Sequence, residues 1–160
     1  MEVKKELERQ FVVFSLQKEK YGIEISSVKE IMKWAKITEL PEMRREIAGV
    51  IKLRNQVIPV VSLRTRFGLP QAEDLTKTKI IILEIGSFSL GINVDDVDEV
   101  IRIKQSAIES PNNLTVKTKV IEGVAKLDDY LLILIDIQAM FAEDDVQQIL
   151  GENEEAVSSL

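Results

Sequence analysis

Residues 49–64 read GVIKLRNQVIPVVSLR, in which two apolar runs flank a short polar segment. The runs at 49–53 and 57–63 are rich in Val and Ile, whose branched side chains favour extended strands. The polar segment from Arg54 to Gln56 has the length of a turn between antiparallel strands. Pro59 has no N–H to donate to a ladder, so it marks an edge or a bulge. The stretch therefore predicts a β-hairpin.

This hairpin has a second copy later in the chain, and the preceding residues are duplicated as well. Ile47, Gly49, Val50, Lys52 and Leu53 recur with the same spacing as Ile121, Gly123, Val124, Lys126 and Leu127. Placing Gly22 on Gly91 brings twelve apolar positions between Phe11 and Trp34 onto apolar positions between Ile80 and Ile103. Self-similarity of this kind indicates a duplicated structural unit.

The same pattern predicts six further strands, so the fold class is mainly β. They are expected at 11–16, 21–25, 79–85, 90–94, 123–127 and 131–137. Two small barrels or strongly curled sheets are the simplest architecture. Each half, about 10–70 and 77–141, is too small for a secure core of its own, so the halves should pack together.

Three short helical segments are expected among the strands, at 43–48, 61–67 and 137–150. The last is a closing C-terminal helix. Residues 143–160 hold six acids and no Lys or Arg, and we expect them to form the acidic end of that helix and a flexible tail.

Composition excludes most familiar active sites. The chain has 160 residues with no Cys and no His, so disulfides, thiolate nucleophiles, imidazole catalysis and soft-metal sites are closed. We predict no catalytic residue, no cofactor and no metal. The net charge of -6, with 21 basic against 27 acidic residues, argues against nucleic-acid binding. No apolar run is long enough to cross a membrane, which predicts a cytoplasmic protein without direct membrane insertion.

The densest acidic cluster comprises Asp95, Asp96, Asp98 and Glu99. It lacks the Gly and the distal Glu of a calcium loop, so solvated turn residues are the better interpretation. A small enzyme using these carboxylates and Asp136 stays an alternative, and it requires a deep pocket with a carboxyl group of raised pKa. A small barrel that binds nucleic acid is a third.

The spacing of Ile25, Val28 and Ile31, and of their copies Val94, Val97 and Val100, is open to two interpretations. Such periodicity usually indicates core packing. It also suits an apolar groove between two barrels that receives an amphipathic helix. Arg54, at the hairpin tip, is likewise either a solvated turn residue or an interface anchor that pairs with a carboxylate.

The stretch 49–64, running on to Phe67 and Gly68, resembles the signature G-V-I-N-L-R-G-x-V-I-P-V-V-D-L of the CheW family. Lys52, Asn55 and Ser62 stand where the family has Asn, Gly and Asp. Asn55 is a mild departure, because Asn tolerates a turn with positive φ. The resemblance implies one CheW-like domain over residues 1–142, built as two intertwined five-stranded SH3-like barrels.

The resemblance also implies a function: a non-catalytic chemotaxis adaptor. Its partners would be the regulatory domain of the chemotaxis histidine kinase and the cytoplasmic tip of methyl-accepting chemoreceptors, a helical hairpin that lies in the groove. Carried over by position, the partner-binding residues are Val12, Ile25, Val28 and Ile31 for the groove, and Arg54 with its neighbours Lys52 and Asn55 for partner contacts. An isolated kinase regulatory domain and a regulatory module of another signalling kinase pathway are related alternatives. The lack of a phosphotransfer His favours a stand-alone adaptor.

Overall fold

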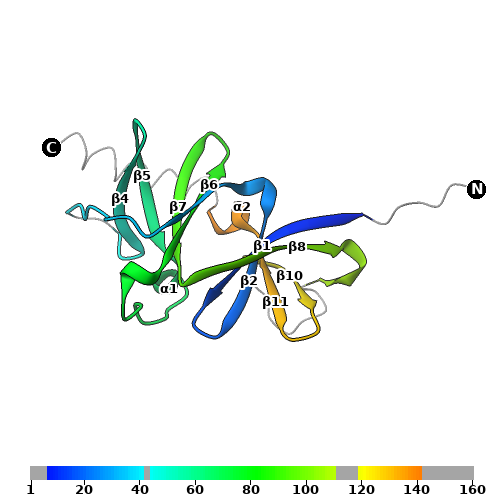
Figure 1. The fold of residues 1–160 in the computed structure, drawn as a ribbon. Helices are drawn as coiled ribbons and strands as arrows, with labels where there is room; N and C mark the ends of the chain where they lie inside the picture. Colours follow the sequence, from blue (N-terminus) through cyan, green and yellow to red (C-terminus); the bar gives the residue numbers. More distant parts are fainter. Residues whose placement is uncertain (1–6, 42–43, 111–118, 142–160) are drawn as a thin grey trace, which may run out of the picture.

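The computed structural model describes residues 7–41, 44–110 and 119–141, and these form two antiparallel-rich sheets (Figure 1). One sheet has six strands in the order β8-β1-β2-β11-β10-β9 and the other has five in the order β3-β6-β7-β5-β4. The six-stranded sheet comprises β1 (Glu8–Leu16), β2 (Glu19–Glu24), β8 (Asp96–Lys104), β9 (Ile108–Glu109), β10 (Ile121–Lys126) and β11 (Leu131–Ile135). The five-stranded sheet comprises β3 (Val28–Lys33), β4 (Ile47–Leu53), β5 (Gln56–Ser62), β6 (Lys79–Ile85) and β7 (Phe88–Val94). The expected mainly β fold is confirmed.

The helices are short and lie between or after the strands. They are α1 (Leu63–Arg66), α2 (Ile137–Met140) and the 3-10 turns η1 (Ile25–Ser27), η2 (Leu75–Lys77) and η3 (Gln105–Ala107). Side chains cap both α-helices: Ser62 Oγ accepts from the Thr65 N–H at 3.3 Å, and Asp136 Oδ1 accepts from the Ala139 N–H at 3.1 Å.

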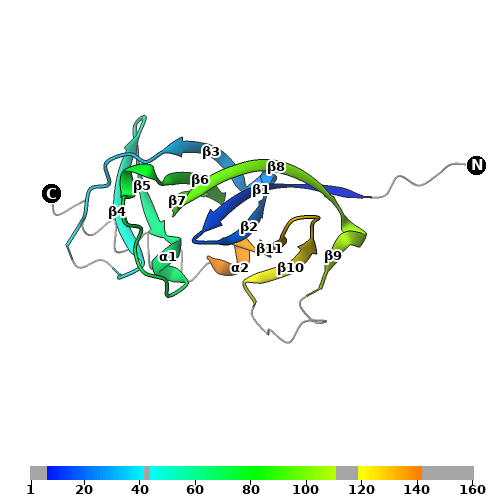
Figure 2. The ribbon, with the colours of Figure 1, turned by 60° about the horizontal axis from the view of Figure 1, so that its bottom comes forward.

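The third strand of each repeat pairs with the first strand of the other repeat. β3 lies against β6, and β8 lies against β1 (Figure 2). The two pairings have matching registers: Ile31 lies opposite Ile81, and Val100, the copy of Ile31, lies opposite Val12. Each sheet therefore takes strands from both repeats, which agrees with the intertwined arrangement that the family resemblance implies.

One large core joins the two sheets. It includes Phe14 and Ile23 from the six-stranded sheet and Val61 and Ile81 from the five-stranded sheet, all with 0% exposure. Two smaller clusters fill the remaining ends, one in each sheet. The halves are thus parts of one folding unit, because neither sheet can bury its inner face without the other.

Gly49 lies in β4, the first strand of the β4–β5 hairpin, and it allows the backbone there to come close to the backbone at Thr38. A Cβ at this position would lie 2.3 Å from the carbonyl oxygen of Thr38, and its φ is +149°. The equivalent Gly123 comes equally near the Glu109 carbonyl, with a Cβ at 2.6 Å. In both strands the register shifts just before the glycine, so each copy has the same irregularity.

The predicted strands are all present, but β3, β8 and β9 were missed. β3 and β8 form edges of their sheets, and polar residues are interspersed among their apolar ones. In the sequence, the apolar residues of β3 therefore resemble a groove lining, and the acidic residues of β8 resemble a solvated turn. Pro59 lies where β5 is paired only with β4, since its pairing with β7 begins at Val60.

Two helix predictions need correction. The helix at 43–48 is wrong, because the described part turns at Arg45 and enters β4 at Ile47. The helix at 61–67 is confined to α1, after β5. The closing helix begins at Ile137 as expected, and residues 142–160, with the acidic tail, lie outside the described residues.

We expect Gly49→Ala to lower the free energy of unfolding by about 2–3 kcal/mol, because the new Cβ meets backbone in a positive-φ conformation. Gly86 is a matched control: its φ is +60° but nothing lies within 4 Å of its added Cβ, so Gly86→Ala should cost about 1 kcal/mol. Urea unfolding measures both. Equal losses would contradict the role assigned to the Thr38 contact.

Candidate functional site

The expected groove residues differ in exposure. Ile25 in η1 is 37% exposed, Ile31 in β3 is 42% exposed, and Val28 between them is half-buried. Val12 is 1% exposed, so its side chain lies in the interior. This burial does not agree with the expected position of Val12 on a surface groove. The structure thus brings three of the four residues onto one exposed edge of the five-stranded sheet.

Two pairs of exposed apolar residues are related by the repeat. Val100 in β8, the copy of Ile31, is 47% exposed. Val57 and Leu131, at 51% and 57%, occupy equivalent positions at the start of β5 and β11. Val57 and Leu131 were missed as surface residues, although each follows directly on a hairpin turn. The molecule therefore presents apolar side chains on two edge strands and at two hairpin tips.

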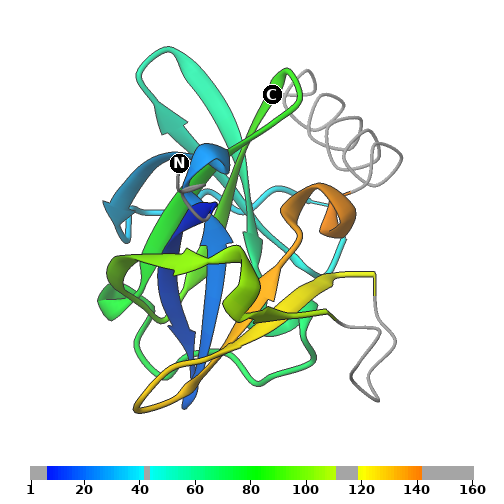
Figure 3. The same ribbon diagram turned by 90° about the vertical axis from the view of Figure 1, so that its right-hand side faces the viewer.

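Arg54 occupies the tip of the β4–β5 hairpin, which projects beyond the six-stranded sheet at the top of Figure 3. Its φ is 56°, whereas Asn55 is not in the left-handed region, so the positive φ falls one residue earlier than expected. Arg54 Nη1 donates to Glu30 Oε2 at 3.3 Å. Lys52 and Asn55 are exposed beside it.

The Arg54–Glu30 pair connects the two edges of the five-stranded sheet. Glu30 belongs to β3, at one end of the strand order, and Arg54 follows β4, at the other end. The side chain of Arg54 is 71% exposed, so this ion pair contributes little to folding stability. It places the Arg54 guanidinium beside Glu30 of β3, the strand that also carries Ile31.

The acidic cluster is not a solvated turn at Asp95. This carboxylate accepts two hydrogen bonds from Arg64, Nε to Oδ1 at 2.6 Å and Nη2 to Oδ2 at 2.5 Å. Its Oδ2 also accepts from the backbone N–H of Gln17 at 2.7 Å. Asp98 pairs with Lys20, and Asp96 Oδ1 accepts from the Val97 N–H. Within the described residues, no group of His, Cys, Asp and Glu is arranged to hold a metal.

The electrostatics of this cluster disagree with a carboxylate enzyme. Burial acts to raise the pKa of Asp95, but the hydrogen bonds from Arg64 and Gln17 outweigh it and lower the pKa below its ordinary value. The pKa of Asp74 is lowered as well, mainly by hydrogen bonds from Thr76. Asp136 caps α2. The alternative of a carboxylate enzyme requires a carboxyl group whose pKa is raised. Among the described carboxyl groups, those with a shifted pKa, Asp74 and Asp95, both have it lowered.

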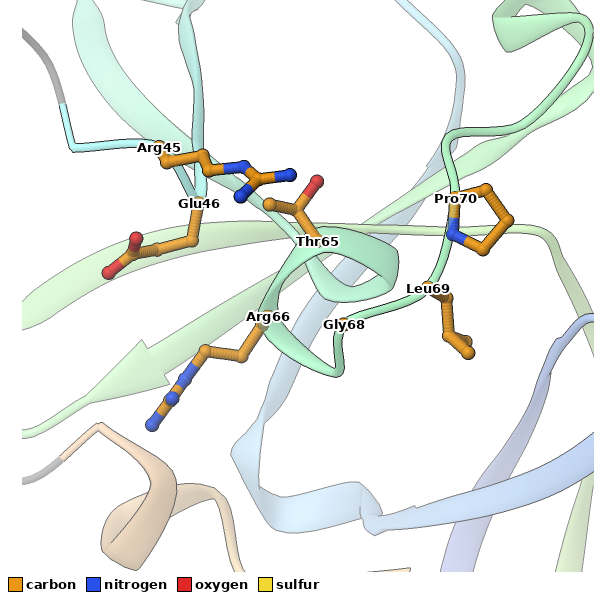
Figure 4. A pocket seen from close by; sticks show the side chains of 7 residues that line it. All are labelled: Arg45, Glu46, Thr65, Arg66, Gly68, Leu69 and Pro70. Carbon is orange, nitrogen blue, oxygen red and sulfur yellow. The ribbon is translucent and has the colours of Figure 1, made fainter.

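A hollow lies beside α1. Arg45, Glu46, Thr65, Arg66, Gly68, Leu69 and Pro70 line it (Figure 4). The Arg45 guanidinium extends toward the Thr65 side chain, while Arg66 points away from it. Glu46 is paired with Arg44 at 2.6 Å. None of the expected partner-binding residues belongs to this hollow.

The lowered pKa of Asp95 predicts a pH dependence of stability. A carboxylate whose pKa is depressed by folding stabilises the protein above its unfolded pKa of about 4, and this contribution is lost as pH falls through the lowered value. Asp95→Asn should therefore reduce the free energy of unfolding at pH 7 and flatten its decline below about pH 4. Urea unfolding between pH 7 and pH 2.5 measures this, and an unchanged slope below pH 4 would contradict it.

Comparison with known proteins identifies the family. Residues 10–145 match the model of the CheW-like domain. The chain is 37% identical over 143 residues to the chemotaxis protein CheW of Bacillus subtilis (strain 168), covering 88% of this chain and 92% of that protein. It is 32% identical over 146 residues to the chemotaxis protein CheW of Treponema pallidum (strain Nichols), covering 88% and 86%.

A solved structure agrees with these relatives. The crystal structure of the scaffolding protein TtCheW from Thermoanaerobacter tengcongensis aligns with a TM-score of 0.77 and 39% identity, covering 87% of this chain and 96% of that chain. Sequence and fold therefore match along nearly the same length. The chain belongs to the CheW-like domain family.

Proposed function

We propose that this chain couples chemoreceptors to the chemotaxis histidine kinase by binding the cytoplasmic tip of the receptor and the regulatory domain of the kinase. Family membership carries the general part: the chain is a chemotaxis scaffold protein and not an enzyme. The single observation that supports the specific part is the exposure of the apolar residues Ile25 and Ile31 on η1 and the edge strand β3.

The apolar edge suits the receptor tip. A helical hairpin binds through apolar side chains spaced along one face, and it needs an apolar strip with a polar margin. We infer that Ile25, Val28 and Ile31 form such a strip on η1 and β3. The charged residues Lys29, Glu30 and Lys33 lie next to them along the chain. Val100 supplies a related apolar position on β8, the edge strand of the other sheet.

The tip of the β4–β5 hairpin suits the kinase domain. Arg54, Lys52 and Asn55 offer donors, and Val57 offers an exposed apolar surface. Arginine combined with apolar contacts is typical of residues that contribute strongly to interfaces. Modest affinity for each partner is sufficient, because an array of adaptors and receptors multiplies weak contacts.

Both proposed partners place the chain in the cytoplasm. No helix in the described part of the chain is long and apolar enough to span a membrane. Lys52 and Ser62 differ from the family signature, and a kinase of another signalling pathway is therefore the alternative partner. Measuring binding to each of the two kinases distinguishes these possibilities. In this structure Ser62 caps α1, a role that its Oγ supports without the carboxylate.

We expect Ile31→Ser to lower the affinity for a receptor-tip fragment about tenfold, because it removes an apolar side chain from the centre of the strip. Leu75→Ser is the matched control, since Leu75 in η2 has nearly the same exposure, 41% against 42%. Isothermal titration calorimetry measures both variants. If the two lose affinity equally, the strip on β3 is not the receptor site.

We expect Arg54→Glu to weaken binding to the kinase regulatory domain about tenfold while the free energy of unfolding changes by less than about 1 kcal/mol. The binding loss arises because a donor to a partner carboxylate becomes a repelling charge. Arg45→Glu makes the same charge change at another exposed residue and should leave binding within about twofold. A large stability loss in Arg54→Glu would contradict its assigned exposure.

A further inference from the structure

The chain passes between the two sheets at two crossovers related by the repeat. The first leads from β2 to β3 through η1, and the second leads from β7 to β8 through Asp95. Each crossover delivers an edge strand that carries an exposed apolar residue, Ile31 on β3 and Val100 on β8. The relative position of these two strands is set by the angle between the sheets.

The second crossover is bonded to both sheets. Arg64, which follows β5 of the five-stranded sheet, holds the Asp95 carboxylate through two N–H groups. Gln17, in the β1–β2 turn of the six-stranded sheet, donates its backbone N–H to the same carboxylate. The Asp95 N–H donates to the Ser15 carbonyl at 3.0 Å, and Arg64 Nη1 reaches the Pro70 carbonyl at 3.0 Å. We name Arg64, Asp95 and Gln17 the latch.

At the first crossover, no such latch is found among the described residues. The residues that the repeat places at the equivalent positions are Ser26 for Asp95, Gln138 for Arg64 and Gly86 for Gln17. Ser26 and Gln138 are exposed, and neither makes a side-chain hydrogen bond in the described structure. Gln17 and Gly86 share the left-handed conformation, with φ of 55° and 60°. The copy with the latch has a residue other than glycine there, and the bond from the Gln17 N–H to Asp95 helps to offset the strain of its positive φ.

The latch is less exposed than the surface ion pair at the hairpin tip, and it has more contacts. The Arg64 and Asp95 side chains are 18% and 20% exposed, against 71% and 31% for Arg54 and Glu30. A partly buried, two-point guanidinium–carboxylate pair fixes both distance and orientation. A single exposed contact at 3.3 Å fixes neither.

We propose that Asp95 is a positioning residue that, through the latch, fixes the angle between the two sheets and so the shape of the surface offered to the receptor. The unlatched first crossover is the compliant side, where a bound partner can shift Ile25 and β3. This inference rests on the proposed receptor binding, but its structural half can be measured on the free protein.

Residual dipolar couplings of backbone amides test the angle directly. In the wild-type chain a single alignment tensor should fit the couplings of β1 and β2 together with those of β6 and β7. In Asp95→Asn we expect the two sheets to require different alignments, while each sheet remains internally consistent. The control is Ile58→Val, which truncates a buried side chain in the five-stranded sheet and lowers stability without touching the latch. A single alignment in Asp95→Asn would overturn the proposal.

Receptor binding then tests the consequence. We expect Asp95→Asn to lose at least fivefold in affinity for the receptor-tip fragment and Ile58→Val less than twofold. The exchanged pair Arg64→Asp with Asp95→Arg should recover part of the affinity, since the ion pair can reform in reverse. Altered couplings with unchanged affinity would overturn the link between sheet angle and binding. If the wild-type chain itself fails to bind, the proposed function falls while the couplings still decide the latch.

Discussion

The exchange of strands between the two repeats is the constraint on which the rest of the molecule depends. β3 pairs with β6, and β8 pairs with β1, so each sheet combines the first two strands of one repeat with the later strands of the other. The largest core cluster therefore draws on both sheets, and burying it requires both repeats at once. The same exchange places β3 and β8 at sheet edges, where Ile31 and Val100 are left available for a partner.

Much of this fold could be predicted because its signals are local. The hairpin at 49–64 has two β-branched runs around a short turn, and the duplication is visible in the alignment of Gly22 with Gly91. The exchange itself has no local signal, and only the resemblance to the CheW family, with its intertwined barrels, predicts it. β3 could pair with the first strand of its own repeat or with that of the other repeat, and the apolar pattern in the sequence would be the same. The reason is that Val12 on β1 and its copy Ile81 on β6 are both apolar and both buried. The choice depends on the path between the sheets.

The site was predicted in part, and the failures have two physical causes. Val12 and Ile25 both fit an apolar alternation, but only the structure distinguishes the buried one from the exposed one. Asp95 resembled a solvated turn residue because its partners are remote in sequence, 31 and 78 positions away for Arg64 and Gln17. A carboxylate among other acids gives no local indication that a distant guanidinium neutralises it.

A duplicated scaffold begins with equivalent surfaces, so recognition of different partners requires the copies to diverge. They diverge at the crossovers and the hairpin tips, and not in the core. Ile25 is 37% exposed while its copy Val94 is 1% exposed, and the tip cation Arg54 has Asp128 as its counterpart. Among the described residues, the latch exists in one copy only. The strand registers of the core match in both copies, so these differences alter the surface without altering the arrangement of the strands. We therefore expect the residues that distinguish one partner from another at positions where the two copies differ.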